Sequence, residues 1–310
     1  MSSPTPSVIC VGHAALDRVF GVDAWPATSA KIVARTFDET GGGMAANAAV
    51  AITRLGAHAQ FWGPVGADAT ADTIEELLRE EDVNVGHMRR FRDLTTSTSA
   101  VLVDANGERL VVGYRGTALQ APADWLRLEL VALADAVLAD VRWPQGAALV
   151  LHAARVAGIP AILDADVAER EVLVRLAASA DHVLYSERGA KTLGGDDLDT
   201  TLRTTIEAGA KVAVVTLGER GVAWIEADSP DGVRRLPAFP VKAVDTLAAG
   251  DVFHGAYAVA IARGLGVTDA ICFASAAAAI KCTRRGGRNG APQWNEVMNF
   301  LATVGDDPKA

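Results

Sequence analysis

Short runs of β-branched and other apolar residues alternate with helical patterns along most of this chain, and this alternation limits the fold more than any other feature. Helical patterns occur at residues 44–55, 70–80 and 146–156. Strands that alternate with helices predict an α/β fold whose mainly parallel central sheet is covered by helices on both faces. The expected buried strands lie at residues 8–12, 60–65, 136–141, 161–165, 182–185 and 211–217.

One region departs from this rhythm. Residues 98–105 and 109–114 alternate like strands around the turn sequence D-A-N-G at residues 104–107, and residues 31–37 (KIVARTF) form a third strand-like stretch. These segments predict a small antiparallel sheet that projects from the main body. We therefore expect a single domain over residues 1–310, with the projecting strands approximately within residues 13–38 and 96–116.

Composition narrows the class of protein. The chain has 310 residues, of which 50% are hydrophobic, so a large core is feasible. Its net charge of −9 argues against nucleic acid or an anionic membrane as the main partner. Three cysteines do not form a disulfide framework, and no basic region precedes an apolar stretch at the N-terminus, so we expect a cytoplasmic protein. The alanine-rich run at residues 274–280 predicts a buried helix.

The stretch DTLAAGDVFHGA, at residues 245–256, is the strongest candidate for a functional site. Its small residues allow backbone N–H groups to approach a ligand closely, and the start of a helix favours an anion. Asp251 would lie at that helix start, where its carboxylate could accept a proton from an attacking hydroxyl beside a phosphate. Alternatively, Asp251 is simply an N-cap residue. The segment alone leaves both interpretations open.

Two further glycine-rich stretches accompany it. GGGMAANAAVAITRLG, at residues 41–56, has glycines before a helix and Asn47 in the first turns, where a polar amide suits a polyhydroxylated ligand. VTLGERGV, at residues 215–222, has two glycines just after a strand. Taken singly, each also fits an ordinary loop.

In this order, the three stretches resemble the PfkB, or ribokinase-like, family of carbohydrate kinases over nearly the whole chain. Residues 41–56 are similar to the family's first signature and residues 245–251 to its second, usually D-T-x-G-A-G-D, while GPVGAD at residues 63–68 matches another common element. The resemblance implies a ribokinase-like three-layer sandwich with a small β lid over the sugar. It also implies ATP as phosphoryl donor, Mg²⁺ as charge neutraliser and a primary hydroxyl of a ketose-type sugar as acceptor.

The resemblance also assigns roles to residues. Asp251 corresponds to the catalytic base and Asp245 to a residue near a monovalent cation such as K⁺ in some members. The backbone of the anion hole corresponds to Ala248, Ala249 and Gly250. Sugar contacts correspond to Asp17, Gly42, Gly43 and Asn47, and ATP contacts to Thr216, Gly218, Gly221 and Gly286.

Two departures from the family pattern affect the phosphate and metal sites. Ala248 replaces the first glycine of G-A-G-D, which costs stability if the position requires a positive φ. Ser186 and Gly189 stand where the family's N-x-x-E element, which helps to organise Mg²⁺ through water, has Asn and Glu. Asp164 and Asp166 are candidates to compensate, or are ordinary residues of a strand-end turn. These departures motivate an alternative function, a non-catalytic sugar or nucleotide sensor.

Within the family, the chain most resembles the 6-deoxy-6-sulfofructose kinases, through VGHAALDRV, AKIVAR, VLADVRW and KCTRRGGRNGAP. In that subgroup a lysine and an arginine matching Lys31 and Arg142 help to hold the sulfonate, together with an asparagine that is Gly113 here. Both cations suit an oxyanion. The alternative is a neutral sugar, as in fructokinases and ribokinases, with Arg142 paired to Asp140 or Asp166 and Lys31 in solvent.

The remaining expectations concern partners and the basic segment at residues 281–288. That segment is either a solvated surface or part of the nucleotide site. Lid strands in this fold can pair between subunits, which makes a homodimer the expected assembly if one forms.

Overall fold

The computed structural model describes residues 5–24, 28, 31–105, 108–229 and 232–305. Within these residues the strands form two sheets, a nine-stranded sheet in the order β13-β12-β11-β10-β9-β8-β1-β4-β5 and a four-stranded sheet in the order β3-β2-β6-β7. The prediction of an α/β fold with a mainly parallel central sheet is confirmed.

The large sheet contains all six predicted strands. Neighbouring strands run parallel from β5 to β11, and only the last two strands, at the other edge, pair antiparallel. The strands are β1 (Ser7–Val11), β4 (His58–Gly66), β5 (Asn84–Phe91), β8 (Ala136–Asp140), β9 (Ala161–Ala165), β10 (His182–Ser186), β11 (Val212–Thr216), β12 (Val222–Glu226) and β13 (Arg234–Leu236).

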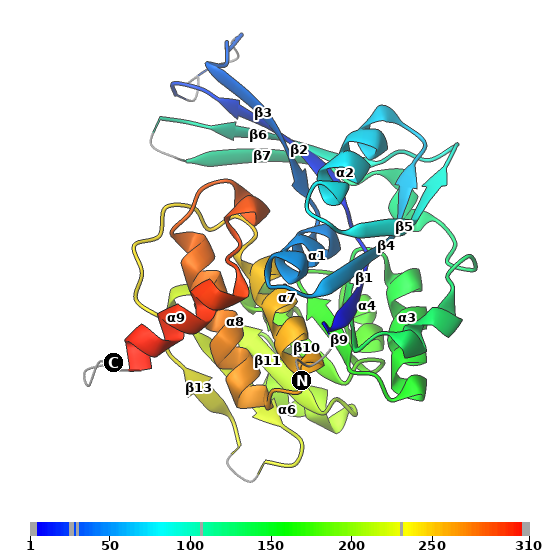
Figure 1. Ribbon diagram of the computed structural model, residues 1–310, viewed down its shortest axis with the longest axis vertical. Coiled ribbons are helices and arrows are strands. Elements are labelled where there is room, and N and C mark those ends of the chain that lie inside the picture. Colours follow the sequence, from blue (N-terminus) through cyan, green and yellow to red (C-terminus); the bar gives the residue numbers. More distant parts are fainter. Residues whose placement is uncertain (1–4, 25–27, 29–30, 106–107, 230–231, 306–310) are drawn as a thin grey trace.

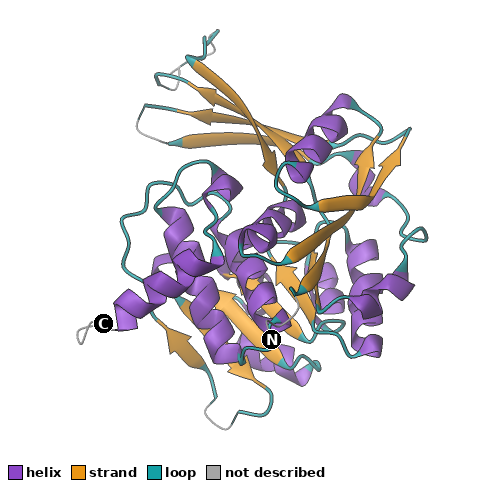
Figure 2. Cartoon of the chain, in the orientation of Figure 1, coloured by secondary structure: helices purple, strands orange, loops and turns teal. Residues whose placement is uncertain are grey.

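Helices cover both faces of this sheet (Figure 2). Alternate residues of β1 point to two separate cores: Val8 and Cys10 belong to one, Ile9 and Val11 to the other. The first core is completed by α1 (Met44–Arg54), α2 (Ala69–Arg79), α7 (Ala249–Ala262), α8 (Val267–Cys282) and α9 (Trp294–Gly305). The second is completed by α3 (Pro144–Ala157), α4 (Arg170–Ala177), α5 (Glu187–Gly194) and α6 (Leu198–Glu207). Among the described residues, no helix has the length and apolar character needed to cross a membrane.

The small sheet projects from the main body at the top of Figure 1. It consists of β2 (Ala15–Gly21), β3 (Thr36–Gly42), β6 (Ser97–Val103) and β7 (Arg109–Tyr114). The predicted pair at residues 98–105 and 109–114 is confirmed as β6 and β7, although Asn106 and Gly107 of the expected turn lie outside the described residues.

The predicted strand at residues 31–37 is wrong for most of its length, because residues 31–34 have no regular structure and β3 begins only at Thr36. β3 then continues to Gly42, beyond the expected range of 13–38. Its first four residues are exposed, so it lacks the alternation of buried and exposed positions by which a strand is recognised. β2, its pairing partner, lies within the expected range of 13–38, although the sequence analysis did not single out this stretch as a strand.

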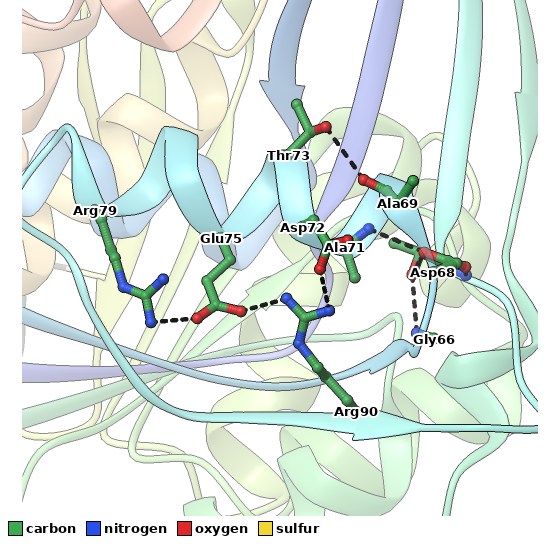
Figure 3. Close-up of polar contacts among 10 residues, drawn as sticks. Gly66, Asp68, Ala69, Ala71, Asp72, Thr73, Glu75, Arg79 and Arg90 are labelled. Carbon is green, nitrogen blue, oxygen red and sulfur yellow. Dashed lines mark hydrogen bonds and ion pairs between the residues drawn. The ribbon is translucent and has the colours of Figure 1, made fainter.

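The G-P-V-G-A-D element joins the large sheet to the small one through Asp68 (Figure 3). One carboxylate oxygen of Asp68 accepts hydrogen bonds from the backbone N–H of Ala71, in α2, and from the hydroxyl of Thr96, at 2.9 and 2.8 Å. The other accepts the N–H of Thr96 at 2.9 Å, one residue before β6. Arg90, in β5, binds two residues of the same helix, Asp72 at 2.6 Å and also Glu75 (Figure 3). This motif therefore caps a helix and positions a strand of the small sheet.

Candidate active site

The carboxyl ends of the parallel strands bring several polar residues to one edge of the large sheet. Asp140 at the end of β8 lies in register with Asp164 of β9, and Ser186 at the end of β10 lies in register with Thr216 of β11. In open α/β sheets this edge is where ligands bind. Arg142 lies two residues after the end of β8, at the carboxyl end of the strand as the sequence predicts.

The start of α7 faces this site without a side-chain cap. Its N-cap residue is Ala248, with φ 60° and ψ 13°, so the alanine has the left-handed conformation in which glycine is preferred. A Cβ added at Gly250 would meet nothing within 4 Å, so there is open space beside the first turn. Asp251 lies in that turn. The helix start therefore offers backbone N–H groups, room for an anion and a carboxylate.

Asp251 is paired with Asn47, which is 204 residues away in the sequence. The side-chain amide of Asn47, in α1, donates a hydrogen bond of 2.7 Å to Oδ2 of Asp251. Burial and the nearby charge of Asp164 raise the pKa of Asp251 to about 7, against the opposing effects of the Asn47 hydrogen bond and His254. A carboxylate with a pKa near neutrality is suited to exchange protons at physiological pH.

His254 and Asp164 form a buried pair behind Asp251, and sequence reasoning missed the histidine. Nδ1 of His254 lies 2.9 Å from Oδ2 of Asp164, and both side chains are buried. Burial lowers the pKa of His254, but the Asp164 carboxylate outweighs this effect and the pKa is raised. The spacing of three residues from Asp251 was the available signal, because positions i and i+3 share a helix face.

The predicted sugar-binding residues of β2, β3 and α1 lie close together. Asp17 accepts a hydrogen bond of 2.6 Å from the hydroxyl of Ser99, and burial raises its pKa. A Cβ at Gly42 would lie 2.4 Å from Oδ2 of Asp17, and a Cβ at Gly43 would lie 2.5 Å from the carbonyl oxygen of His13. Neither position has room for a side chain, because the Asp17 carboxylate and the His13 backbone lie too close. Gly43 also has φ 93°.

Arg142 adopts the alternative in which it pairs with a carboxylate. Its guanidinium binds Oδ2 of Asp166 at 2.7 Å and the carbonyl oxygen of Val167 at 2.6 Å. Lys31 is exposed and belongs to no helix or strand. A Cβ at Gly113, in β7, would meet nothing within 4 Å. The two cations predicted to act together on the substrate therefore have different surroundings.

Arg288 is a buried cation that sequence reasoning left within a basic segment of undecided role. Its side chain is buried, and its Nε and Nη1 have no hydrogen-bond partner among the described residues. A Cβ at Gly41 would lie 1.9 Å from its Nη2, so the guanidinium lies directly on the glycine-rich strand beside Asp17. Burial lowers the pKa of Arg288 to about 10. A buried guanidinium with unused N–H groups suits an oxygen-rich ligand.

A second concentration of positive charge at this edge comes from two arginines near His13. Burial, followed by the charges of Arg142 and Arg115, lowers its pKa to about 4. The imidazole is therefore neutral at physiological pH, while two guanidinium groups lie close enough to affect it. The stretch VGHAALDRV was noted in the sequence, but His13 was not singled out.

The predicted nucleotide-binding residues lie at and after the end of β11. Thr216 donates to the carbonyl oxygen of Tyr185 at 3.2 Å. Gly218, Gly221 and Gly286 all have positive φ angles, and a Cβ at Gly221 would lie 2.0 Å from the carbonyl oxygen of Leu236. Gly218 has no such contact within 4 Å, which leaves space beside it.

The departure from the N-x-x-E element has a structural basis. A Cβ at Gly189 would lie 2.2 Å from the carbonyl oxygen of Ala165, so a glutamate does not fit this backbone. Ser186 caps α5 by accepting the N–H of Gly189 and donates to Asp166 at 2.7 Å. Asp166 is thus engaged by Ser186 and Arg142. In the described parts of the chain, no group of three or more His, Cys, Asp or Glu side chains is arranged to hold a metal ion.

Asp245, the expected neighbour of a monovalent cation, is contacted by a lysine. The ammonium of Lys281 donates to the carbonyl oxygen of Asp245 at 2.7 Å and lies 3.5 Å from its Oδ1. Oδ2 of Asp245 accepts the N–H groups of Gly286 and Gly287 at 3.1 and 3.3 Å. Like Arg288, Lys281 belongs to the basic segment at residues 281–288, and it is fully buried.

Comparison with known proteins places these features in a family context. Residues 5–294 match the pfkB family of carbohydrate kinases. Ribokinase of Bacillus subtilis is 31% identical over 298 residues, which cover 95% of this chain and 99% of that protein. A crystal structure of a provisional ribokinase from Agrobacterium tumefaciens has a TM-score of 0.92 at 38% identity, covering 98% of this chain and all of the other. Ribokinase of Arabidopsis thaliana, complexed with ribose and ATP, has a TM-score of 0.84 at 26% identity, covering 96% and 98% of the two chains.

Proposed function

This chain belongs to the pfkB family of carbohydrate kinases, and from that premise we propose that it transfers the γ-phosphoryl group of ATP to a primary hydroxyl of a ketose-type sugar, with Asp251 as general base. That it is an ATP-dependent sugar kinase of the ribokinase type follows from the family match and its relatives. The roles of individual residues and the choice of sugar are our proposals. The pairing of Asp251 with Asn47 at the uncapped start of α7 is the observation that supports them most directly.

In the proposed reaction the chain's residues position reactants and move one proton. Asn47 occupies Oδ2 of Asp251, so Oδ1 is the oxygen that accepts the proton of the sugar hydroxyl. The hydroxyl oxygen forms a bond to the γ-phosphorus, the bond from that phosphorus to the bridging oxygen breaks, and ADP leaves. Backbone N–H groups at Ala248, Ala249 and Gly250 would stabilise the negative charge on the transferred group.

Mg²⁺ bound with ATP would supply neutralisation of the phosphate charge. The chain offers it oxygen ligands of the type that it prefers, because Asp164 keeps a buried Oδ1 without a hydrogen-bond partner among the described residues. Asp164 is therefore the residue that would hold the ion or its coordinated water. Thr216, Gly218, Gly221 and Gly286 would contact the nucleotide.

The test of the kinase assignment is release of ADP from ATP and Mg²⁺ in the presence of a panel of sugars. We expect ADP formation that depends on one class of sugar. Binding of sugar or ATP without ADP formation on any sugar would favour the alternative, a sensor. The raised pKa of Asp251 supports the kinase, because a binding protein gains nothing from a proton acceptor beside the phosphate site.

We propose further that the sugar carries an anionic group, as 6-deoxy-6-sulfofructose does. Two observations support this. Arg115 and Arg142 lie near the neutral His13, and Arg288 has unused N–H groups beside Asp17. A neutral sugar would leave Nε and Nη1 of the buried Arg288 without an anionic hydrogen-bond acceptor, although the carboxylates of Asp17 and Glu81 lie near its charge. Lys31 is exposed, so its side chain would have to move toward the substrate to contribute to binding of the anionic group. The alternative is a neutral sugar such as ribose, which the names of the relatives favour.

Substrate kinetics separate these alternatives. Comparison of kcat/KM for ribose, fructose and 6-deoxy-6-sulfofructose should favour the anionic sugar. Arg142→Ala and Arg288→Ala should each raise its KM by about 10-fold or more, since charge-assisted hydrogen bonds contribute about 1.5–3 kcal/mol, and should barely change KM for ATP. Arg285→Ala, at an exposed position in the same segment, is the control. Equal efficiency on fructose and sulfofructose would exclude the anionic substrate and leave the kinase assignment intact.

Two further expectations belong with this function. We propose a cytoplasmic location, supported by three free cysteines. We also propose a homodimer formed through the strands of the small sheet, supported by the exposed apolar side chains of Leu110, Val111 and Val112 on β7. Light scattering of the purified protein tests the dimer, and Val111→Lys should shift it toward the monomer.

A further inference from the structure

A buried positive charge lies directly beneath the turn that leads into α7. Lys281, near the end of α8, has no exposed surface, which is rare for lysine because an ammonium loses its hydration on burial. Its ammonium donates to the carbonyl oxygen of Asp245 at 2.7 Å and lies 3.5 Å from Oδ1 of the same residue. The fold therefore holds a cation where the turn begins.

Asp245 joins this cation to three segments of the chain. Its Oδ1 accepts the N–H of Leu247 at 2.8 Å, within the turn itself. Its Oδ2 accepts the N–H groups of Gly286 and Gly287, which lie beyond the end of α8. The N–H groups of Val244 and Asp245 both bind the carbonyl oxygen of Cys282, at 2.8 and 3.1 Å. A shift of Asp245 would therefore displace the start of the turn relative to α8.

The turn requires such support. Ala248 has a left-handed conformation, which costs roughly 1–2 kcal/mol for a residue with a side chain. α7 then begins without a side-chain cap, so the direction of its first N–H groups depends on the preceding residues. A conformation that is unfavourable locally persists only when its surroundings hold it in place.

A dissociable monovalent cation does not fit at Asp245, because its carbonyl oxygen and Oδ1 already contact an ammonium of the same charge and its Oδ2 accepts two backbone N–H groups. We propose that Lys281 is the resident cation of this site. Its ammonium fixes residues 245–250 so that the N–H groups of α7 face the transferred phosphate, and the enzyme consequently needs no K⁺. The expected effect of Lys281 on kcat rests on the proposed kinase function. Its expected effect on the melting temperature does not.

The first test uses the unmodified enzyme. Its kcat and its melting temperature are measured in choline chloride and then in NaCl, KCl and NH₄Cl at equal ionic strength. Both quantities should be the same in all four salts. Activation by K⁺ of several-fold over choline, or a melting temperature that rises specifically with K⁺, would overturn the proposal.

The second test removes the ammonium. Lys281→Ala should lower kcat by about 10²-fold, the effect of displacing a catalytic group by about 1 Å, and should leave KM for the sugar nearly unchanged. It also creates space beside Asp245, so K⁺ or methylammonium should restore part of kcat and raise the melting temperature, since a ligand that binds only the folded state stabilises it. Lys281→Met fills the space, so neither cation should rescue it.

Lys242→Ala is the control, because Lys242 lies three residues before Asp245 and is exposed. Unchanged kcat in Lys281→Ala, or equal rescue by choline, would contradict the proposal. If Lys281→Ala does not fold, Lys281→Met and the salt series on the unmodified enzyme still decide the question. If the protein phosphorylates no sugar, the kinase proposal fails, and the melting temperatures alone test the role of Lys281.

Discussion

The two helices that meet at the candidate active site begin in similar ways, but different forces determine their first residues. Both α1 and α7 lack a side-chain cap, and both have an N-cap residue with a positive φ, 93° at Gly43 and 60° at Ala248. At Gly43, a Cβ would collide with the carbonyl oxygen of His13 at 2.5 Å. At Ala248, a Cβ is present and only the backbone conformation disfavours it. Glycine is thus required at a helix start where another backbone segment leaves no room for a Cβ. Where only a positive φ disfavours other residues, alanine is tolerated.

The two helices are also joined by a hydrogen bond between side chains that differ in chemistry, an amide and a carboxylate. Asn47 of α1 donates to Asp251 of α7, and only the second residue is expected to exchange a proton. Replacing Asp251 by Asn should therefore have the largest effect, a loss of kcat of about 10²–10⁴-fold, the usual contribution of a general base. ATP affinity, measured by calorimetry, should change little. Asp124→Asn, at an exposed position, is the control. The structure already excludes Asp251 as the N-cap residue, which is Ala248, so a variant that retains more than about a tenth of kcat would show that Asp251 is not the general base.

The steric requirement at α1 predicts the next largest effect. Gly43→Ala should lower the free energy of unfolding by about 1–3 kcal/mol through overpacking, in addition to the penalty for a positive φ. Urea denaturation measures this difference. Gly158→Ala is the matched control, because Gly158 has φ 73° but a Cβ there would meet nothing within 4 Å. Equal destabilisation by the two substitutions would mean that contact with His13 is unimportant.

The hydrogen bond between the helices predicts a change in pH dependence. Asp251 must be ionised to accept a proton, so kcat/KM should rise with pH through about 7, where its raised pKa lies. Asn47 favours the ionised form, so Asn47→Ala should move this rise to higher pH. The shift should be about 1–2 pH units, because a hydrogen bond to a charged group contributes about 1.5–3 kcal/mol and about 1.36 kcal/mol corresponds to one pKa unit. An unchanged profile would place the titrating group elsewhere.

The smallest effect is expected at the start of α7. Ala248→Gly should raise the free energy of unfolding by about 0.5–1 kcal/mol, because it relieves an unfavourable φ but increases the entropy of the unfolded chain. We expect kcat to be unchanged or modestly higher. Thermal unfolding and steady-state kinetics measure both. A clear loss of activity would show that the methyl group of Ala248 is a fitted part of the phosphate site.

The sequence by itself determined the alternation of strands and helices in the large sheet and the candidate places where ligands approach the backbone. Buried parallel strands have continuous apolar runs, and helix starts rich in small residues have few alternatives, so both features are local and can be recognised one segment at a time. Asp251 was recognised as a candidate in this way, whereas the glycines at residues 42 and 43 were assigned to the sugar by the family resemblance. β3 was misplaced because its exposed residues carry no such periodicity.

Only the tertiary structure decided which charges are buried and which partners they have. In the basic segment at residues 281–288, Lys281 and Arg288 are buried, whereas Arg285 is exposed, and nothing in the residue types distinguishes them. The pairing of Asn47 with Asp251 joins residues 204 positions apart. Burial and pairing of a charge depend on what other segments bring to the same place, and the free energy of an ion changes by several kcal/mol with those surroundings. Local sequence therefore located the candidate catalytic edge, and packing decided the surroundings of each cation at that edge.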